Sequence, residues 1–172
     1  MKLLFSSLAL VSTLSLAQAQ NFIAHLDGAQ DGGGARMGMG TVSITLSGTT
    51  LTMSGSFSGL TTAASAAHIH GPAAPGINGG ILYSLGGSVI TLGSTAGTIS
   101  GNVSLIANPN GTTFSVADQL NQLNSGLWYV NIHDMTFPGG EIRGQILAVP
   151  EPATWALGGL GVLGLLAWRR RK

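Results

Sequence analysis

Apolar residues recur at every second position through most of residues 20–149, and this pattern constrains the fold more than any other feature of the chain. Side chains two apart on a β-strand share a face, so each alternating segment presents one apolar face to a core. Gly, Ser and Thr, which favour tight turns, separate the segments. The predicted strands cover residues 22–26, 41–46, 51–57, 67–70, 80–85, 98–106, 128–133 and 141–147. We therefore predict an all-β domain, an antiparallel sandwich or barrel.

One short helix is expected within this domain. Ser115 is a typical N-cap residue, and Asp118 three positions later completes a variant of the capping box. Three apolar residues share one face at helical spacing, namely Val116, Leu120 and Leu123. Gly126 suits the left-handed conformation that ends many helices. The sequence thus predicts a helix between residues 115 and 126.

The charge distribution excludes a nucleic-acid-binding face. Of the seven Lys and Arg residues, only Arg36 and Arg143 lie between residues 20 and 149, where the acidic residues outnumber them. Nucleic-acid binding requires a basic face that displaces counterions from phosphates. Cysteine is absent, which excludes disulfides, thiolate chemistry and cysteine-based zinc sites. The domain is expected to be held together by core packing alone.

The first 19 residues have the three parts of a secretory signal peptide. Lys2 precedes an apolar run over residues 3–16, and Ala17-Gln18-Ala19 is a small-x-small cleavage site. We predict a signal helix, residues 1–19, that is removed after Ala19. An uncleaved N-terminal anchor is the alternative, and the Ala-x-Ala ending favours cleavage.

The C-terminal tail, residues 149–172, combines three features. Val149-Pro150-Glu151-Pro152 comes first, residues 153–168 are uncharged and mostly apolar, and Arg169-Arg170-Arg171-Lys172 ends the chain. As a helix, residues 153–168 would span about 24 Å at about 1.5 Å per residue, slightly less than a bilayer core. We predict a transmembrane helix over residues 153–168. Its basic end, residues 169–172, favours the cytoplasm, which leaves the domain outside.

This tail is similar to the PEP-CTERM sorting signal, and the matching residues are Pro150, Glu151, Pro152, Arg169, Arg170 and Arg171. The resemblance implies a Gram-negative bacterium, of a kind that often makes exopolysaccharide or biofilm. It also implies recognition by exosortase, a membrane cysteine transpeptidase. The tail would then sit only transiently in the inner membrane and be cut near its Pro-Glu-Pro motif. The protein would end at the cell surface or outside the cell.

The segment between the two ends carries a second resemblance, in three blocks. They are Phe22-x-Ala-x-Leu-x-Gly, Ala67-His68-Ile69-His70-Gly71, and residues 128–133 with Pro138-Gly139-Gly140-Glu141-Ile142-Arg143-Gly144-Gln145. They are similar to the CHRD domain, which is named for its repeats in animal chordin and also occurs alone in secreted bacterial proteins. The match predicts a domain over residues 20–148. It implies an extracellular β-domain, with no catalytic activity established for the class. Residues 86–101 depart from the family pattern as an inserted hairpin.

Histidines form the candidate site. His68 and His70 point to one face of a predicted strand, with Cα atoms roughly 6.5–7 Å apart, so both imidazoles can bind one metal ion. A sequence pattern occurs twice: a strand ending in Ile-His, then four residues, then Pro-Gly and a second strand. The Ile-His pairs are Ile69-His70 and Ile132-His133. This repeat places His133 at an equivalent strand end. Three histidines with an open position suit Cu(II) or Zn(II). His25 is a further candidate ligand.

Four polar residues near these histidines are candidates for groups that orient the ligands: Asn131, Asp134, Glu141 and Arg143. The alternative is structural, because strand-end histidines often hydrogen-bond loop carbonyls. Glu141 and Arg143 would then form a partly exposed ion pair that contributes at most about 1 kcal/mol.

Three functions remain open on the sequence. The first is an exported surface or matrix-type binding protein that contacts exopolysaccharide, another surface protein or a metal. The second is a copper or zinc metalloprotein with redox activity, because the His-x-His pair resembles the copper ligands of Cu/Zn superoxide dismutase. That resemblance is limited to the pair and the sandwich class. The third is a purely structural surface protein. Nucleophilic catalysis has little support, since the chain lacks a Gly-x-Ser-x-Gly elbow, and a non-enzymatic role is favoured.

Overall fold

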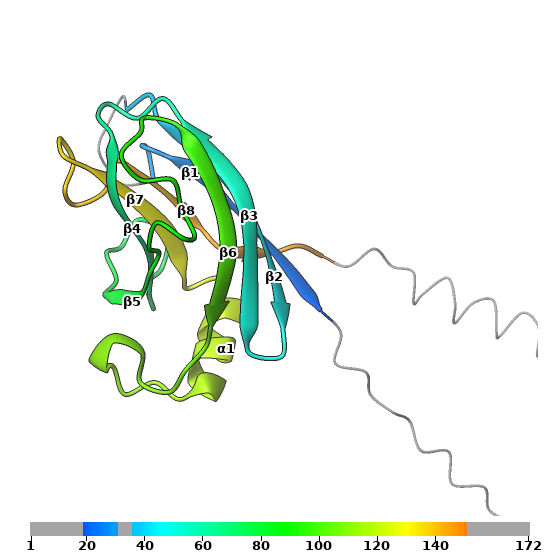
Figure 1. Ribbon diagram of the computed structural model, residues 1–172. Helices are drawn as coiled ribbons and strands as arrows, with labels where there is room; N and C mark the ends of the chain where they lie inside the picture. The colour runs from blue at the N-terminus through cyan, green and yellow to red at the C-terminus, as the bar shows by residue number, and fades with distance from the viewer. Residues whose placement is uncertain (1–18, 31–35, 151–172) are drawn as a thin grey trace, which may run out of the picture.

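The computed structural model describes residues 19–30 and 36–150, and Figure 1 shows their arrangement. A nine-stranded antiparallel sheet dominates this part of the chain, so the predicted all-β class is confirmed. In chain order the elements are β1 (Gln20–Asp27), β2 (Met39–Ser47), β3 (Thr50–Ser58), β4 (Ala64–His70), β5 (Ile81–Ser84), β6 (Gly97–Ser104), a short 3-10 helix η1 (Pro109–Gly111), α1 (Val116–Asn124), β7 (Tyr129–Asp134), β8 (Ile142–Gln145) and β9 (Leu147–Ala148).

The strands follow the order β5-β4-β7-β8-β1-β2-β3-β6, and β9 pairs with β1. The sheet curls into a nearly closed barrel (Figure 1), which decides between the two predicted architectures. The predicted strand over residues 141–147 divides into β8 and β9. Between them, the buried Ile146 donates its backbone N–H to Trp128 at 2.8 Å.

The connection between β5 and β6 brings the two ends of the sheet together. Gly93 donates its backbone N–H to Ala64 of β4 at 2.9 Å, and Ile90 forms a bridge with Ile99 of β6. The segment predicted as an inserted hairpin is therefore bonded both to β4 and to the edge strand β6.

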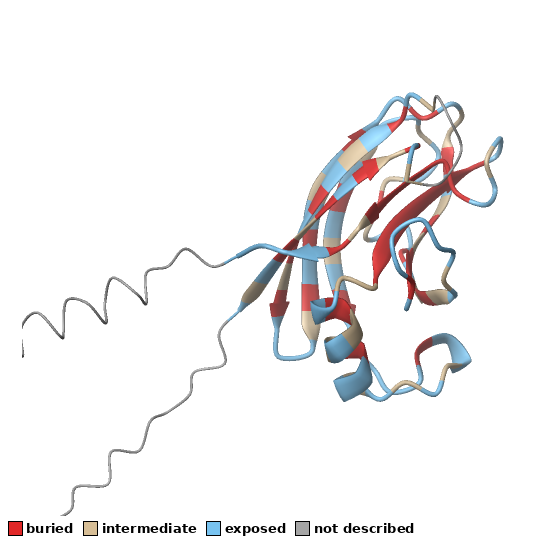
Figure 2. Cartoon of the chain, turned by 180° about the vertical axis from the view of Figure 1, so that it is seen from behind, coloured by how far each residue is buried: buried red, intermediate tan, exposed pale blue. Residues whose placement is uncertain are grey.

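The interior of the barrel holds the apolar residues that the alternation predicts. Burial alternates along β1, β2, β3 and β6, but β7 is buried along its whole length (Figure 2). The largest fully buried side chains are Trp128, Phe22, Leu26, Ile44, Leu51, Met53, Ile69, Leu82, Ile90, Ile99, Leu123 and Ile132. A strand that is buried on both faces must have something covering its outer face, and this feature locates the site described below.

The helix α1 has the predicted capping box. The Ser115 hydroxyl accepts the Asp118 backbone N–H at 3.1 Å, and the Asp118 carboxylate accepts the Ser115 N–H at 2.9 Å. Leu123 is fully buried against the core, and Gly126 has a positive φ of 67° just past the helix end. The helix is thus fixed at its start by side-chain hydrogen bonds and along its length by burial.

Within the described residues, α1 is much too short to cross a bilayer, and no other helix there is long and apolar enough to do so. The predicted signal helix and the predicted transmembrane helix over residues 153–168 lie outside the described residues.

We expect Ser115→Ala to lower the free energy of unfolding by about 1 kcal/mol, because the Asp118 N–H loses its acceptor. Urea denaturation measures the change. Ser100→Ala is the matched control, since Ser100 is an exposed serine on β6 and lies outside any cap. Equal effects of the two substitutions would contradict the capping account.

Candidate metal centre

The pairing of β4 with β7 sorts their side chains onto two faces. His68 lies opposite Asn131, and Ile69 lies opposite Val130. Directly paired residues point to the same side of a sheet. Ile69 and Val130 are fully buried in the core, so His68, Asn131 and their neighbours two residues away lie on the outer face. His70 and His133 are two of those neighbours.

Two loops cover this outer face and hold two of the histidines. The His70 Nδ1 lies 3.0 Å from the Gly79 carbonyl oxygen, in the loop between β4 and β5. The His133 Nδ1 lies 2.9 Å from the Pro138 carbonyl oxygen, in the loop between β7 and β8. A carbonyl oxygen only accepts, so both Nδ1 atoms carry the proton. In the neutral rings the lone pair is then on Nε2, the tautomer that a metal-ligating histidine takes when a carbonyl orients it.

The three imidazoles converge. The His68 Nδ1 lies 2.9 Å from the His133 Nε2, and one nitrogen from each of His68, His70 and His133 lies within 4.8 Å of the others. Two nitrogens bound at about 2.05 Å to one ion are about 2.9 Å apart at a right angle and about 3.3 Å apart at a tetrahedral angle. The His68–His133 spacing already falls in this range, and the other spacings, which reach up to 4.8 Å, would have to contract to hold one ion.

The electrostatics of the cluster keep His68 neutral. Burial, followed by the proximity of His133 and of His70, lowers the pKa of His68 from 6.5 to about 4. A metal ion competes with protons for a histidine nitrogen, so a depressed pKa leaves the ligand available well below neutral pH.

Tyr129 is a member of this site that the sequence did not single out. Its ring stacks on the His70 ring, with centroids 5.0 Å apart and planes inclined by 13°. Its hydroxyl accepts the Gly79 N–H at 3.0 Å, in the same loop that binds His70. Period-two alternation places Tyr129 on the face of Asn131 and His133, and this parity is the signal that would have identified it.

Arg143, on β8, packs against the Tyr129 ring that stacks on His70. Its guanidinium carbon lies 5.0 Å from the Tyr129 ring centroid, and its Nη1 donates to the Asn78 side chain at 2.7 Å. Its Nε also donates to the Gln30 carbonyl. Arg143, predicted as an orienting group, thus ties two loops to the aromatic ring that packs on His70.

Asp134 and Glu141 are buried and form a different arrangement. The Asp134 carboxylate accepts the Thr62 N–H at 2.8 Å, and the Glu141 carboxylate accepts the Thr61 N–H at 2.9 Å. Burial raises the pKa of Glu141, and neighbouring Asp134 raises it further. Burial also pushes up the pKa of Asp134, but hydrogen bonds from Thr62 and Phe137 outweigh burial and lower it. The two carboxyl groups clamp the β3–β4 loop against the ends of β7 and β8.

His25 does not join the cluster. It lies exposed on β1, with its Nδ1 3.4 Å from the Thr41 hydroxyl. Asn131 does lie on the face of the three histidines, where its Nδ2 donates to Gly139 at 3.1 Å.

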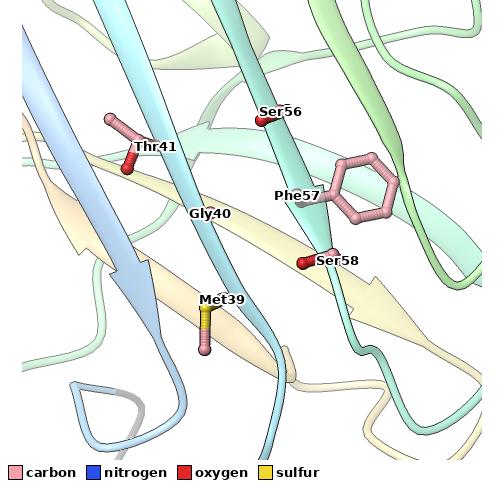
Figure 3. Close-up of a pocket in the computed structure, with 6 residues that line it drawn as sticks. All are labelled: Met39, Gly40, Thr41, Ser56, Phe57 and Ser58. Carbon is pink, nitrogen blue, oxygen red and sulfur yellow. The ribbon is translucent and has the colours of Figure 1, made fainter.

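A surface hollow of about 290 Å³ lies on β2 and β3 (Figure 3), lined by Met39, Gly40, Thr41, Ser56, Phe57 and Ser58. In the sheet order β8 and β1 separate these strands from β7, so the hollow and the histidine cluster are distinct.

Comparison with known families agrees with the two resemblances in the sequence. The CHRD domain model matches residues 22–146, which is most of the chain. The chain belongs to the CHRD domain family. The PEP-CTERM protein-sorting motif matches residues 148–172, so the CHRD domain is followed by a signal for exosortase-type processing, which indicates export and surface sorting in Gram-negative bacteria. Comparisons with curated proteins and with solved structures give no match.

We expect the metal-free CHRD domain to lose stability as the pH falls from about 6.5 to about 4. The His68 pKa is depressed in the folded state, so over this window the unfolded chain binds a proton that the folded chain excludes. His68→Gln removes the titrating imidazole, so the variant should gain stability relative to the parent protein as the pH falls. Urea denaturation in the presence of a chelator, repeated across this range, measures the difference. Parallel pH profiles for the two proteins would show that His68 titrates normally.

Proposed function

We propose that this exosortase-sorted surface protein binds one Cu(II) or Zn(II) ion in its CHRD domain. The ligands are the His68 Nδ1, the His70 Nε2 and the His133 Nε2. The observation that carries the proposal is the convergence of one nitrogen from each of the three rings to within 4.8 Å. Three imidazoles suit both ions, and they leave a position on the ion for an external ligand.

The structural alternative explains only part of this arrangement. Bonds from Nδ1 to loop carbonyls would lock the two loops whether or not a metal binds. They do not by themselves account for a third imidazole on the face of the sheet that the two loops cover, where the His68 Nδ1–H donates to the His133 Nε2 at 2.9 Å in the metal-free protein. The buried Tyr129, stacked on His70, and the arginine over Tyr129 also support a fixed ring orientation, which a metal site requires.

The purified protein is expected to bind about one equivalent of Cu(II) or Zn(II). Substituting any one of His68, His70 and His133 by Ala should weaken binding at least about 100-fold, because one of three ligands is lost. Isothermal titration calorimetry measures the affinity, and mass spectrometry of the native protein gives the stoichiometry. His25→Ala is the matched control and should bind like the parent, since His25 is exposed on β1.

Two results would refute the site. One is a parent protein that takes up neither ion after chelation and reloading. The other is an affinity that all three single substitutions leave unchanged.

A second candidate function, binding of a neutral polysaccharide, comes from the outward face of β2, β3 and β6. Registered rows of small polar side chains cross these three strands: Thr41, Ser56 and Thr98; Ser43, Ser54 and Ser100; Thr45, Thr52 and Asn102. All carry hydroxyl or amide groups and none is charged. Such a face suits the hydroxyl groups of an uncharged exopolysaccharide, which is consistent with surface sorting.

We expect the protein to sediment with an insoluble neutral glucan, such as cellulose, and Ser54→Glu to reduce the bound fraction several-fold. Ser54 is exposed at the centre of the three rows, where a charge must be desolvated against the glucan. Asn121→Glu, at an exposed position on α1, introduces the same charge away from the sheet face and serves as the control. Equal sedimentation of parent and Ser54→Glu would exclude this face as the contact.

A further inference from the structure

The four strands around the histidine cluster are related by an approximate two-fold rotation. Their order is β5-β4-β7-β8, with β4 and β7 antiparallel at the centre. A rotation about an axis between β4 and β7 exchanges β4 with β7 and β5 with β8. The repeated sequence pattern obeys this rotation, because the Ile-His pair ending at His70 corresponds to the Ile-His pair ending at His133. Each of these histidines also hydrogen-bonds a carbonyl in the loop that follows it.

The same rotation makes Asn131 the counterpart of His68. Each lies two residues before the strand-end histidine of its own strand, and the two are direct partners in the β4–β7 register. The axis therefore passes between His68 and Asn131. A fully symmetric arrangement would place a fourth histidine at position 131, where this chain has an asparagine.

The surroundings of Asn131 hold its side chain against the loop between β7 and β8, which also binds His133. Asn131 is 2% exposed. Its Nδ2 donates to the Gly139 carbonyl at 3.1 Å, and His133 binds the preceding carbonyl, that of Pro138, at 2.9 Å. Gly140 has a φ of 124°, and a Cβ there would overlap the Asn131 amide, so the loop leaves room for this side chain.

The Asn131 Oδ1 is a buried acceptor for which the described part of the chain provides no hydrogen-bond donor. Buried polar atoms are nearly always paired, so an orphaned one in a polar site points to a donor from a bound group. Near three histidines, the donor that fits is a water molecule bound to the metal ion.

We propose that Asn131 defines the fourth position of the metal site. Its Oδ1 accepts a hydrogen bond from a water molecule on the ion, and this water is the ligand that an external anion replaces. The inference rests on the proposed function, since it requires the three-histidine site. The metal centre would then be an open site with one exchangeable coordination position. Asn131 would keep that position open, because its side chain binds the water molecule and not the ion.

The sharpest test converts the fourth position into a ligand. In the parent protein loaded with Co(II), added azide should change the visible absorption spectrum, because it replaces the water. In Asn131→His, a fourth imidazole should occupy the position, tighten Zn(II) binding at least about tenfold and abolish the response to azide. X-ray absorption spectroscopy of the Zn(II) forms should count three imidazoles in the parent and four in the variant.

Two further variants separate an effect on the ion from an effect on folding. Asn131→Ala should keep one equivalent of Zn(II) but bind it about tenfold more weakly, the size of effect seen when an orienting group is lost. Asn131→Asp keeps the acceptor oxygen but loses the Nδ2 donor to Gly139, so an affinity above that of Asn131→Ala would assign the effect on the ion to this oxygen. Asn102→Ala, an exposed asparagine on β6, is the matched control and should behave like the parent.

The outcomes distinguish this inference from the proposed function. If the histidine substitutions abolish binding but Asn131→His and Asn131→Ala both match the parent in affinity, azide response and ligand count, Asn131 does not face the ion and this inference is wrong, while the three-histidine site stands. A parent protein that binds no Co(II) or Zn(II) overturns both.

Discussion

The antiparallel pairing of β4 with β7 is the contact on which the rest of the site depends. Its register places Ile69 against Val130 in the core and His68 against Asn131 on the outer face. Side chains alternate strictly along a strand, so a slip of one residue in either strand would turn its histidines into the apolar core. The core residues hold the register, and the register in turn holds the imidazoles together.

The covered outer face of β7 costs free energy unless its polar groups are paired. The structure meets this cost mainly through loops. Backbone groups of Gly79 serve both His70 and Tyr129, the Pro138 and Gly139 carbonyls serve His133 and Asn131, and Thr61 and Thr62 serve the two buried carboxylates. The strands place the side chains on one face, and the loops fix how each ring is turned.

Much of this could be predicted from local pattern. The strands, the capped helix and the shared face of His68 and His70 follow from spacing alone, and the repeated Ile-His pattern correctly placed His133 at the matching strand end. The barrel closure could not be predicted, because it depends on a bond from Gly93 to Ala64 of β4, which lies far away in sequence. The partners of Asp134 and Glu141 were missed for a similar reason. Proximity to His133 in sequence suggested an orienting role, whereas both carboxylates bind Thr61 and Thr62 of the β3–β4 loop.

The segment that joins β5 to β6 has a consequence for how copies of this protein coexist. An unprotected strand edge offers free N–H and C=O groups that recruit a second chain into a continuous sheet. Here the bridge from Ile90 to Ile99 occupies the outer side of β6, and β5 is a strand of only four residues whose Ile81 carbonyl is taken by the Asn110 amide. Dense packing of many such molecules on a bacterial envelope would therefore not seed fibrils through these two strands, although the domain has no disulfide to restrain it.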